Sequence, residues 1–242
     1  MAVLCAGAAI LAVSNTAHGR NQITLQRDWK FAKTDSTGKK GAWQEVRVPH
    51  DWAVHEPFSR QHDLQIVAVE QNGETEKTAK TGRTGGLPYM GRGTYTTTFN
   101  VADTTGQKFT LVFDGAMSNP SVSVNGHHAG GWAYGYNSFY IDLPEGIVHP
   151  GDNTLTVDLE NKPQSSRWYP GAGLYRNVHL VSTSKIHVPV WGTYLTTPYV
   201  SAEEASVKLI TEIEGAGKGE AVTVNTVITD PCILYTSEDA DE

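Results

Sequence analysis

The feature that most constrains the fold is a succession of short segments in which apolar and polar residues alternate, separated by turn-forming residues. Alternation with a period of two places one set of side chains on the buried face of a sheet and the other in solvent. The segments from Asn21 onward that we expect to be strands are residues 21–25, 29–33, 94–101, 108–115, 121–126, 139–143, 153–160 and 177–183. Nothing reads as a long amphipathic helix, so the pattern predicts an all-β fold, a two-sheet sandwich or jelly roll.

Two of these segments carry more specific signals. Residues 111–113 are apolar without interruption, which is typical of a strand in the middle of a sheet. Asn125-Gly126 supplies the two positive-φ positions of a type I′ turn, so a hairpin is expected there.

A long stretch poor in strand signals interrupts this pattern between His55 and Met90. A connection of this length inside a compact domain is usually a functional loop or a disordered segment. Residues 81–89, "TGRTGGLPY", are rich in turn formers and end in an aromatic residue, and we expect them to cross one face of the molecule.

The pattern changes near Ser184, where residues 185–201, 205–215 and 221–231 resemble the opening strands of a second β domain. An immunoglobulin-like sandwich needs about seven strands and ~100 residues. Only 58 residues follow Ser184, and the last eleven, 232–242, form an atypical acidic tail. We therefore expect a complete domain over 21–184 and a partial second domain over 185–231.

The charge balance argues against two classes of partner. Nineteen Lys and Arg face 26 Asp and Glu, for a formal net charge of −7, and no basic block offsets it. Binding to nucleic acid or to an anionic membrane surface is therefore disfavoured.

The N-terminal residues 1–20 resemble a secretory signal peptide. The apolar run 1–13 is too short to span a bilayer and is followed by small polar residues, although a basic n-region is missing. The alternative is an apolar N-terminal segment without a targeting role. Export predicts a secreted or periplasmic protein, and removal of Cys5 would leave Cys232 alone, without an internal disulfide.

The stretch "SRWYPGAGLYRNVHL", residues 166–180, combines aromatic residues with tight-turn residues. Trp168 and Tyr169 offer flat apolar faces with polar edges, suited to the C–H face of a sugar, and Arg167 offers a fork of donors. The alternative is a structural corner in which Trp168 closes the end of the sandwich and Arg167 pairs within the domain. Both interpretations agree that Gly171 and Gly173 force a turn.

Two further segments contain candidate ligand-binding residues. In "VPHDW", His50 and Asp51 could bond to one another or to a ligand, whereas in the alternative Asp51 caps a turn and Trp52 belongs to the core. Arg83 lies on a glycine-rich tip that could reach over a neighbouring pocket, or could simply be solvated. The spacing of a phosphate-binding Walker loop is absent.

We expect no metal and no cofactor. His127 and His128 are adjacent on an expected strand, so their side chains point to opposite faces. The "GDN" segment at 151–153 lacks the run of oxygen ligands that a calcium loop shows.

Seven motifs in order carry a resemblance to a known family: "RDWKFAK", "VPHDW", "GRGTYTTTF", "LVFDGAMSNPSVSVNG", "YNSFYIDL", "GDNTLTV" and "SRWYPGAGLYRNVHL". From about Arg27 to Val181 the chain closely resembles the N-terminal sugar-binding domain of glycoside hydrolase family 2, especially secreted bacterial β-galactosidases. The resemblance implies a galactose-binding-like jelly-roll β-sandwich followed by an incomplete immunoglobulin-like β-sandwich. It also implies that the loop at 166–173 faces the mouth of the active site, with β-galactoside-type carbohydrate as the ligand.

The resemblance further implies a partner that this sequence does not encode. Family members continue into a (β/α)₈ barrel that holds two catalytic glutamates, and retaining glycosidases need two carboxyls about 5–5.5 Å apart. In the barrel the acid/base follows an Asn, whereas Glu160-Asn161 here has the reverse order. We therefore expect no catalytic residue and no hydrolysis from this chain alone, which would support the barrel and lend loops to its pocket. The alternatives are a stand-alone carbohydrate-binding module and, on architecture alone, an adhesion module.

Overall fold

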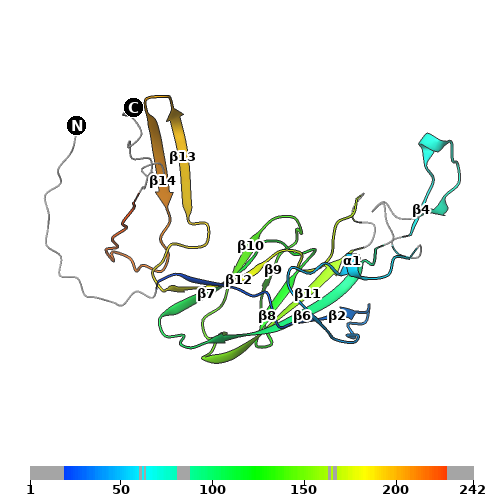
Figure 1. Ribbon diagram of the computed structural model, residues 1–242, viewed down its shortest axis with the longest axis horizontal. Coiled ribbons are helices and arrows are strands. Elements are labelled where there is room, and N and C mark those ends of the chain that lie inside the picture. The colour runs from blue at the N-terminus through cyan, green and yellow to red at the C-terminus, as the bar shows by residue number, and fades with distance from the viewer. Residues whose placement is uncertain are drawn as a thin grey trace, which may run out of the picture.

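The computed structural model describes residues 19–59, 62, 64–80, 88–162, 165 and 168–227 (Figure 1). The expected signal segment, except for its last two residues, and the acidic tail at 232–242 lie outside the described residues. Two sheets dominate the described part, and every strand pair within them is antiparallel.

The larger sheet has six strands in the order β3-β2-β6-β11-β8-β9. Their bounds are Gln44–Val46 (β3), Trp29–Thr34 (β2), Gly91–Val101 (β6), Gly151–Asn161 (β11), Ser121–Val124 (β8) and His127–Gly131 (β9). The two longest strands, β6 and β11, pair along all of their length from Gly151↔Val101 to Asn161↔Gly91. This pair forms the centre of the sheet.

The smaller sheet has four strands in the order β1-β12-β7-β10. Their bounds are Asn21–Thr24 (β1), Val178–Ser184 (β12), Gln107–Phe113 (β7) and Phe139–Asp142 (β10). The apolar run 111–113 falls in β7, which lies between two neighbours as expected for an interior strand.

One hydrophobic core joins the inner faces of both sheets. In β6, Tyr95 and Phe99 point inward while Thr98 and Asn100 are exposed, which is the alternation that the sequence predicts. The core residues Phe31, Phe113 and Leu155 come from different strands of the two sheets and belong to one cluster. The all-β sandwich expected from the sequence is therefore confirmed.

The expected hairpin at Asn125-Gly126 is also confirmed. Both residues have positive φ, 51° and 79°, and they join β8 to β9. The Asn125 side chain donates to the Asn153 side chain at 2.8 Å and to the Ile147 carbonyl at 2.9 Å, so the turn is tied to the strands below it.

The described part of the long stretch from His55 to Met90 contains little regular structure. It follows the one-turn helix α1 (Trp52–His55) and includes a small hairpin of β4 (Gln65–Val67) and β5 (Thr78–Lys80) with the short 3₁₀ segment η1 (Glu70–Asn72) between them. Figure 1 shows this hairpin projecting from one end of the sandwich. Residues 81–87, with Arg83, lie outside the described residues.

The region after Ser184 forms a second hairpin, β13 (Thr193–Val200) with β14 (Ala205–Thr211). It stands away from the sandwich at the opposite end from β4–β5 (Figure 1). The expected strand at 221–231 is not formed over its described part, 221–227, where every residue is exposed. A strand needs a hydrogen-bonded neighbour, and the described residues provide none for this segment.

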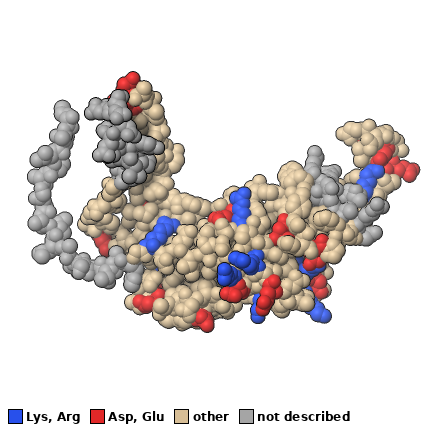
Figure 2. Space-filling view, viewed as in Figure 1, with Lys and Arg blue, Asp and Glu red and all other residues tan. Residues whose placement is uncertain are grey.

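The surface of the sandwich carries both signs of charge. Acidic and basic side chains are interspersed on the face that Figure 2 shows, with several opposite charges next to one another. Within the described ranges, no helix has the length and apolar character that crossing a bilayer requires.

Candidate functional site

The corner after Tyr169 brings together segments that are far apart in the sequence. Gly173 has φ +116°, and a Cβ atom there would lie 2.4 Å from the Tyr95 hydroxyl and 2.5 Å from the His50 carbonyl oxygen. Its own N–H and carbonyl bond to Met117 at 2.9 Å each. Only glycine fits this position, so the corner is built into the fold.

The "VPHDW" segment, residues 48–52, lies against this corner. The Trp52 N–H donates to the Ala172 carbonyl at 2.9 Å, and the His50 N–H donates to the Leu174 carbonyl at 2.7 Å. The two candidate segments of the sequence analysis, which are about 120 positions apart, therefore lie side by side.

Asp51 is the centre of this junction. Its Oδ1 accepts from the Ala53 N–H at 2.9 Å, which caps helix α1, and from the Ala172 N–H at 3.0 Å. Its Oδ2 accepts from the Tyr169 hydroxyl at 2.6 Å. Burial, together with this carboxylate, raises the pKa of the Tyr169 hydroxyl well above its usual value, so this phenol remains a donor. One carboxylate thus fixes both the helix and the loop.

His50 points away from this junction into the sandwich. Its Nδ1 lies 2.6 Å from the Tyr95 hydroxyl, and its ring stacks on His55 with centroids 5.4 Å apart. Burial, with the neighbouring His55, lowers the pKa of His50 to about 4, so the ring is neutral near pH 7. The fold holds His50 rather than presenting it to solvent.

Trp168 and Tyr169 remain at the surface after the corner is built. Their exposed fractions are 59% and 44%. The Trp168 Nε1–H donates to the Tyr136 hydroxyl at 2.8 Å, which fixes one edge of the indole. The interpretation in which Trp168 closes the end of the sandwich is therefore wrong, because more than half of this side chain is exposed.

Arg167 and Arg83 lie outside the described residues, so their positions stay predictions. Of the candidate residues that are described, the structure brings Asp51 and Tyr169 into direct contact, and Trp168 precedes Tyr169 in the chain. It turns His50 toward Tyr95 instead.

Tyr136 is a residue that sequence reasoning missed. It belongs to "GWAYGYNSF", residues 131–139, where aromatic residues alternate with small ones between two strands. The available signal was a concentration of three rings within five residues that contain no aliphatic residue larger than alanine.

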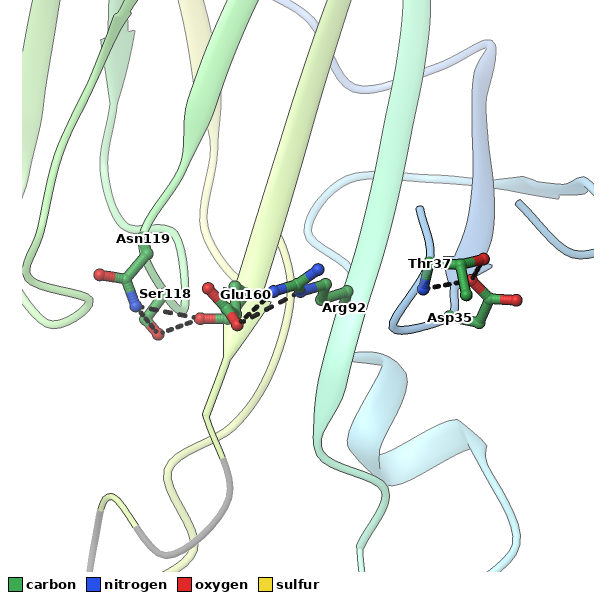
Figure 3. A network of polar contacts seen from close by, with 6 residues as sticks. All are labelled: Asp35, Thr37, Arg92, Ser118, Asn119 and Glu160. Atoms are coloured by element: carbon green, nitrogen blue, oxygen red, sulfur yellow. Dashed lines mark hydrogen bonds and ion pairs between the residues drawn. The ribbon is translucent and has the colours of Figure 1, made fainter. Parts of the chain in front are cut away.

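Glu160 and Asn161 both have structural partners. Figure 3 shows Glu160 on β11 between Arg92 of β6 and the Ser118–Asn119 turn. Its carboxylate accepts from Arg92 at 3.0 Å, and its carbonyl accepts from Ser118 at 2.8 Å. The Asn161 amide donates to the Gly171 carbonyl at 2.7 Å and so supports the corner.

The arrangement offers aromatic faces and hydrogen-bonding edges on a rigid frame. An apolar ring face suits the C–H groups of a sugar, and a hydroxyl or a carboxylate beside it suits the sugar hydroxyls. Among the described residues, no group of three or more His, Cys, Asp or Glu side chains could hold a metal ion.

No protein-family model matches the chain. Over 229 residues it is 34% identical to the beta-galactosidase BoGH2A of Bacteroides ovatus, a match that covers 90% of this chain and 25% of that protein. The chain thus spans about a quarter of the length of this curated relative.

Solved structures that resemble the chain include glycoside hydrolase family 2 proteins as well. A glycosyl hydrolase family 2 member from Bacteroides cellulosilyticus superimposes with a TM-score of 0.66 at 25% identity, covering 80% of this chain and 24% of that one. The beta-glucuronidase of Bacteroides uniformis shares the fold with a TM-score of 0.58 at 21% identity, covering 80% of this chain and 22% of that one. By sequence and by fold, the chain is therefore similar to the N-terminal region of glycoside hydrolase family 2 proteins.

Proposed function

We propose that this chain is the non-catalytic, sugar-facing region of a β-galactosidase-type enzyme, in which it supports the catalytic barrel and lends the loop at 168–173 to the substrate pocket. The observation that carries the proposal is the Asp51 junction. In this junction one carboxylate accepts two hydrogen bonds from a surface loop whose two aromatic residues, Trp168 and Tyr169, stay exposed. If the corner served the fold alone, we would expect at least one of these two rings to be buried.

The substrate class we propose is an uncharged β-galactoside. The relative that is 34% identical is named as a beta-galactosidase, which supports this choice. The negative charge of Asp51 beside Tyr169 favours a neutral sugar over a uronic acid, because two carboxylates at one site repel each other.

The proposal assigns no catalytic residue to this chain. The purified protein should release no chromophore from a chromogenic β-galactoside above the uncatalysed rate. Hydrolysis that survives stringent purification would overturn this part of the proposal. We also propose that the protein acts outside the bacterial cytoplasm, which detection of the mature N-terminus in a periplasmic or secreted fraction would test.

A stand-alone carbohydrate-binding module is the second candidate, favoured by the exposed faces of Trp168 and Tyr169. An NMR titration with methyl β-galactoside separates the two. Millimolar or tighter binding that is lost in Trp168→Ala favours the module. A flat titration favours the scaffold, whose pocket has its other wall in the barrel.

A further inference from the structure

A second set of exposed rings lies next to the loop at 168–173. Trp132, Tyr134 and Tyr136 occur in the connection between β9 and β10, with exposed fractions of 42%, 58% and 38%. We call these three residues the aromatic platform. The function proposed above makes no use of Trp132 or Tyr134.

The backbone of this connection is held at several points. The Trp132 N–H donates to the Pro120 carbonyl at 3.2 Å, and the Gly135 carbonyl accepts from the Tyr175 hydroxyl at 2.7 Å. Gly135 is buried, and a Cβ atom there would lie 2.4 Å from the sulfur of Met117. The connection is therefore pressed against the sandwich.

The rings themselves are also held. Trp132 stacks on Phe139 at 5.8 Å and 5°, and Phe139 stacks on the core residue Phe113 at 4.8 Å and 6°. The Trp132 Nε1–H donates to the Asn137 side chain at 3.0 Å. A ring fixed in this way loses little conformational entropy when a ligand covers it.

The platform is continuous with the loop of the proposed site. Tyr134 and Tyr136 meet edge to face at 5.5 Å, and the Tyr136 hydroxyl accepts from Trp168. Residues 131–138 include no charged side chain. The two loops together present neighbouring aromatic faces without an ion-pairing group in the platform.

The kind of apolar residue indicates the kind of ligand. The large apolar side chains that the segment 131–138 exposes are all aromatic. Hairpin β13–β14, in contrast, exposes the aliphatic Leu195, Val207 and Ile210 as well as tyrosines. Aliphatic side chains suit the interior of a protein. Flat rings with hydrogen-bonded edges suit a pyranose, which has an apolar face and polar hydroxyls around it.

We propose that the aromatic platform is a carbohydrate-binding subsite for an uncharged β-linked glycan of several residues. That the same glycan continues toward Trp168 rests on the function proposed above. Binding at the platform itself does not depend on that proposed function.

The test is calorimetric titration of the full chain with β-1,4-galactotetraose and, separately, with cellotetraose. At least one should bind, and Tyr134→Ala should weaken it about tenfold, as expected for the loss of one stacked ring. Trp132→Ala should act in the same direction. Trp43→Ala is the matched control, because Trp43 is a comparably exposed ring (44%) far from the platform. It lies just before β3, and β3 and β9 are the two opposite edge strands of the six-stranded sheet. Its effect should stay within about twofold, an energy difference below that of one stacked ring.

Unchanged thermal unfolding of Tyr134→Ala, whose ring is 58% exposed, would separate lost binding from lost folding. The proposal is overturned if neither tetrasaccharide binds, or if binding survives both platform substitutions. It is also overturned if Tyr134→Ala changes only the association state of the chain in sedimentation, which would make the platform a protein contact. None of these results bears on the absence of hydrolysis, so the scaffold function can stand when the platform fails.

Discussion

The sandwich and hairpin β13–β14 show what an alternating sequence can and cannot determine. In the sandwich, inward residues such as Leu155 are 0% exposed because a second sheet covers them. In strand β14 of the hairpin, Val207 and Leu209 also alternate with polar residues, yet they are 47% and 36% exposed. Alternation defines a strand and its faces, but burial requires a partner sheet, and the described residues contain one only for the sandwich.

A pair of leucine substitutions should show this difference most strongly. Leu155→Ala removes a fully buried side chain and should lower the free energy of unfolding by about 2–5 kcal/mol. Leu209→Ala in the hairpin should change it by no more than ~0.5 kcal/mol. Urea denaturation followed by tryptophan fluorescence measures both. Equal effects would mean that the hairpin is as well packed as the sandwich.

The corner at Gly173 should be the next most sensitive position. Gly173→Ala places a Cβ atom against Tyr95 and His50 at a positive φ and should cost at least about 2 kcal/mol. Gly106→Ala is the matched control, since Gly106 lies in the sandwich and has φ +64° with open space around it, and should cost about 1 kcal/mol. If Gly173→Ala were as mild as the control, the corner would be more deformable than its contacts indicate.

The Asp51 side chain forms hydrogen bonds with segments that are far away in the sequence, whereas the Ser201 side chain forms them only within its own turn. Asp51→Ala removes the helix cap and the bonds from Tyr169 and Ala172, and should lower stability by about 1–2 kcal/mol. Ser201→Ala breaks bonds only within the turn of the hairpin and should lie within ~0.5 kcal/mol of the unchanged chain. The same denaturation assay compares them, and a larger effect at Ser201 would refute the special position of Asp51.

His50 should give the sandwich a pH dependence that the hairpin lacks. Burial lowers its pKa to about 4, so folding disfavours the charged ring, and the stability present above pH 6.5 is lost as the pH falls toward 4. Because the ring is only half-buried, solvent screening should limit the loss to about 1 kcal/mol. His50→Gln should flatten this part of the stability profile. A profile that keeps its slope in His50→Gln would assign the effect to another group.

Much of the fold could be predicted from the sequence because the strands of the sandwich have a strong period of two. The edge strand β3 was missed because its three residues, Gln44–Val46, are too few to show a period. The expected strand at 221–231 failed for the opposite reason. Its pattern is clear, but pairing depends on a neighbour that local sequence does not reveal.

The candidate site was predicted in its parts but not in its assembly. Asp51 and Tyr169 were both candidates, yet their hydrogen bond joins positions 118 apart, which no local pattern encodes. Tyr136 was missed because its importance comes from the indole that it meets. Sequence patterns thus identified residue types that could bind a sugar, whereas only the tertiary contacts show which of these residues lie together.

The most direct test is an NMR titration of a chain that ends at Gly192, which keeps Val190 in contact with Val112 and Val181. If the sandwich is a complete, sugar-facing unit, this shorter chain should fold, with dispersed amide signals and a melting midpoint close to that of the full chain. On addition of β-1,4-galactotetraose, the amide signals that move should be those of residues 132–136. A shorter chain that does not fold, or sugar-induced shifts confined to other surfaces, would contradict the account.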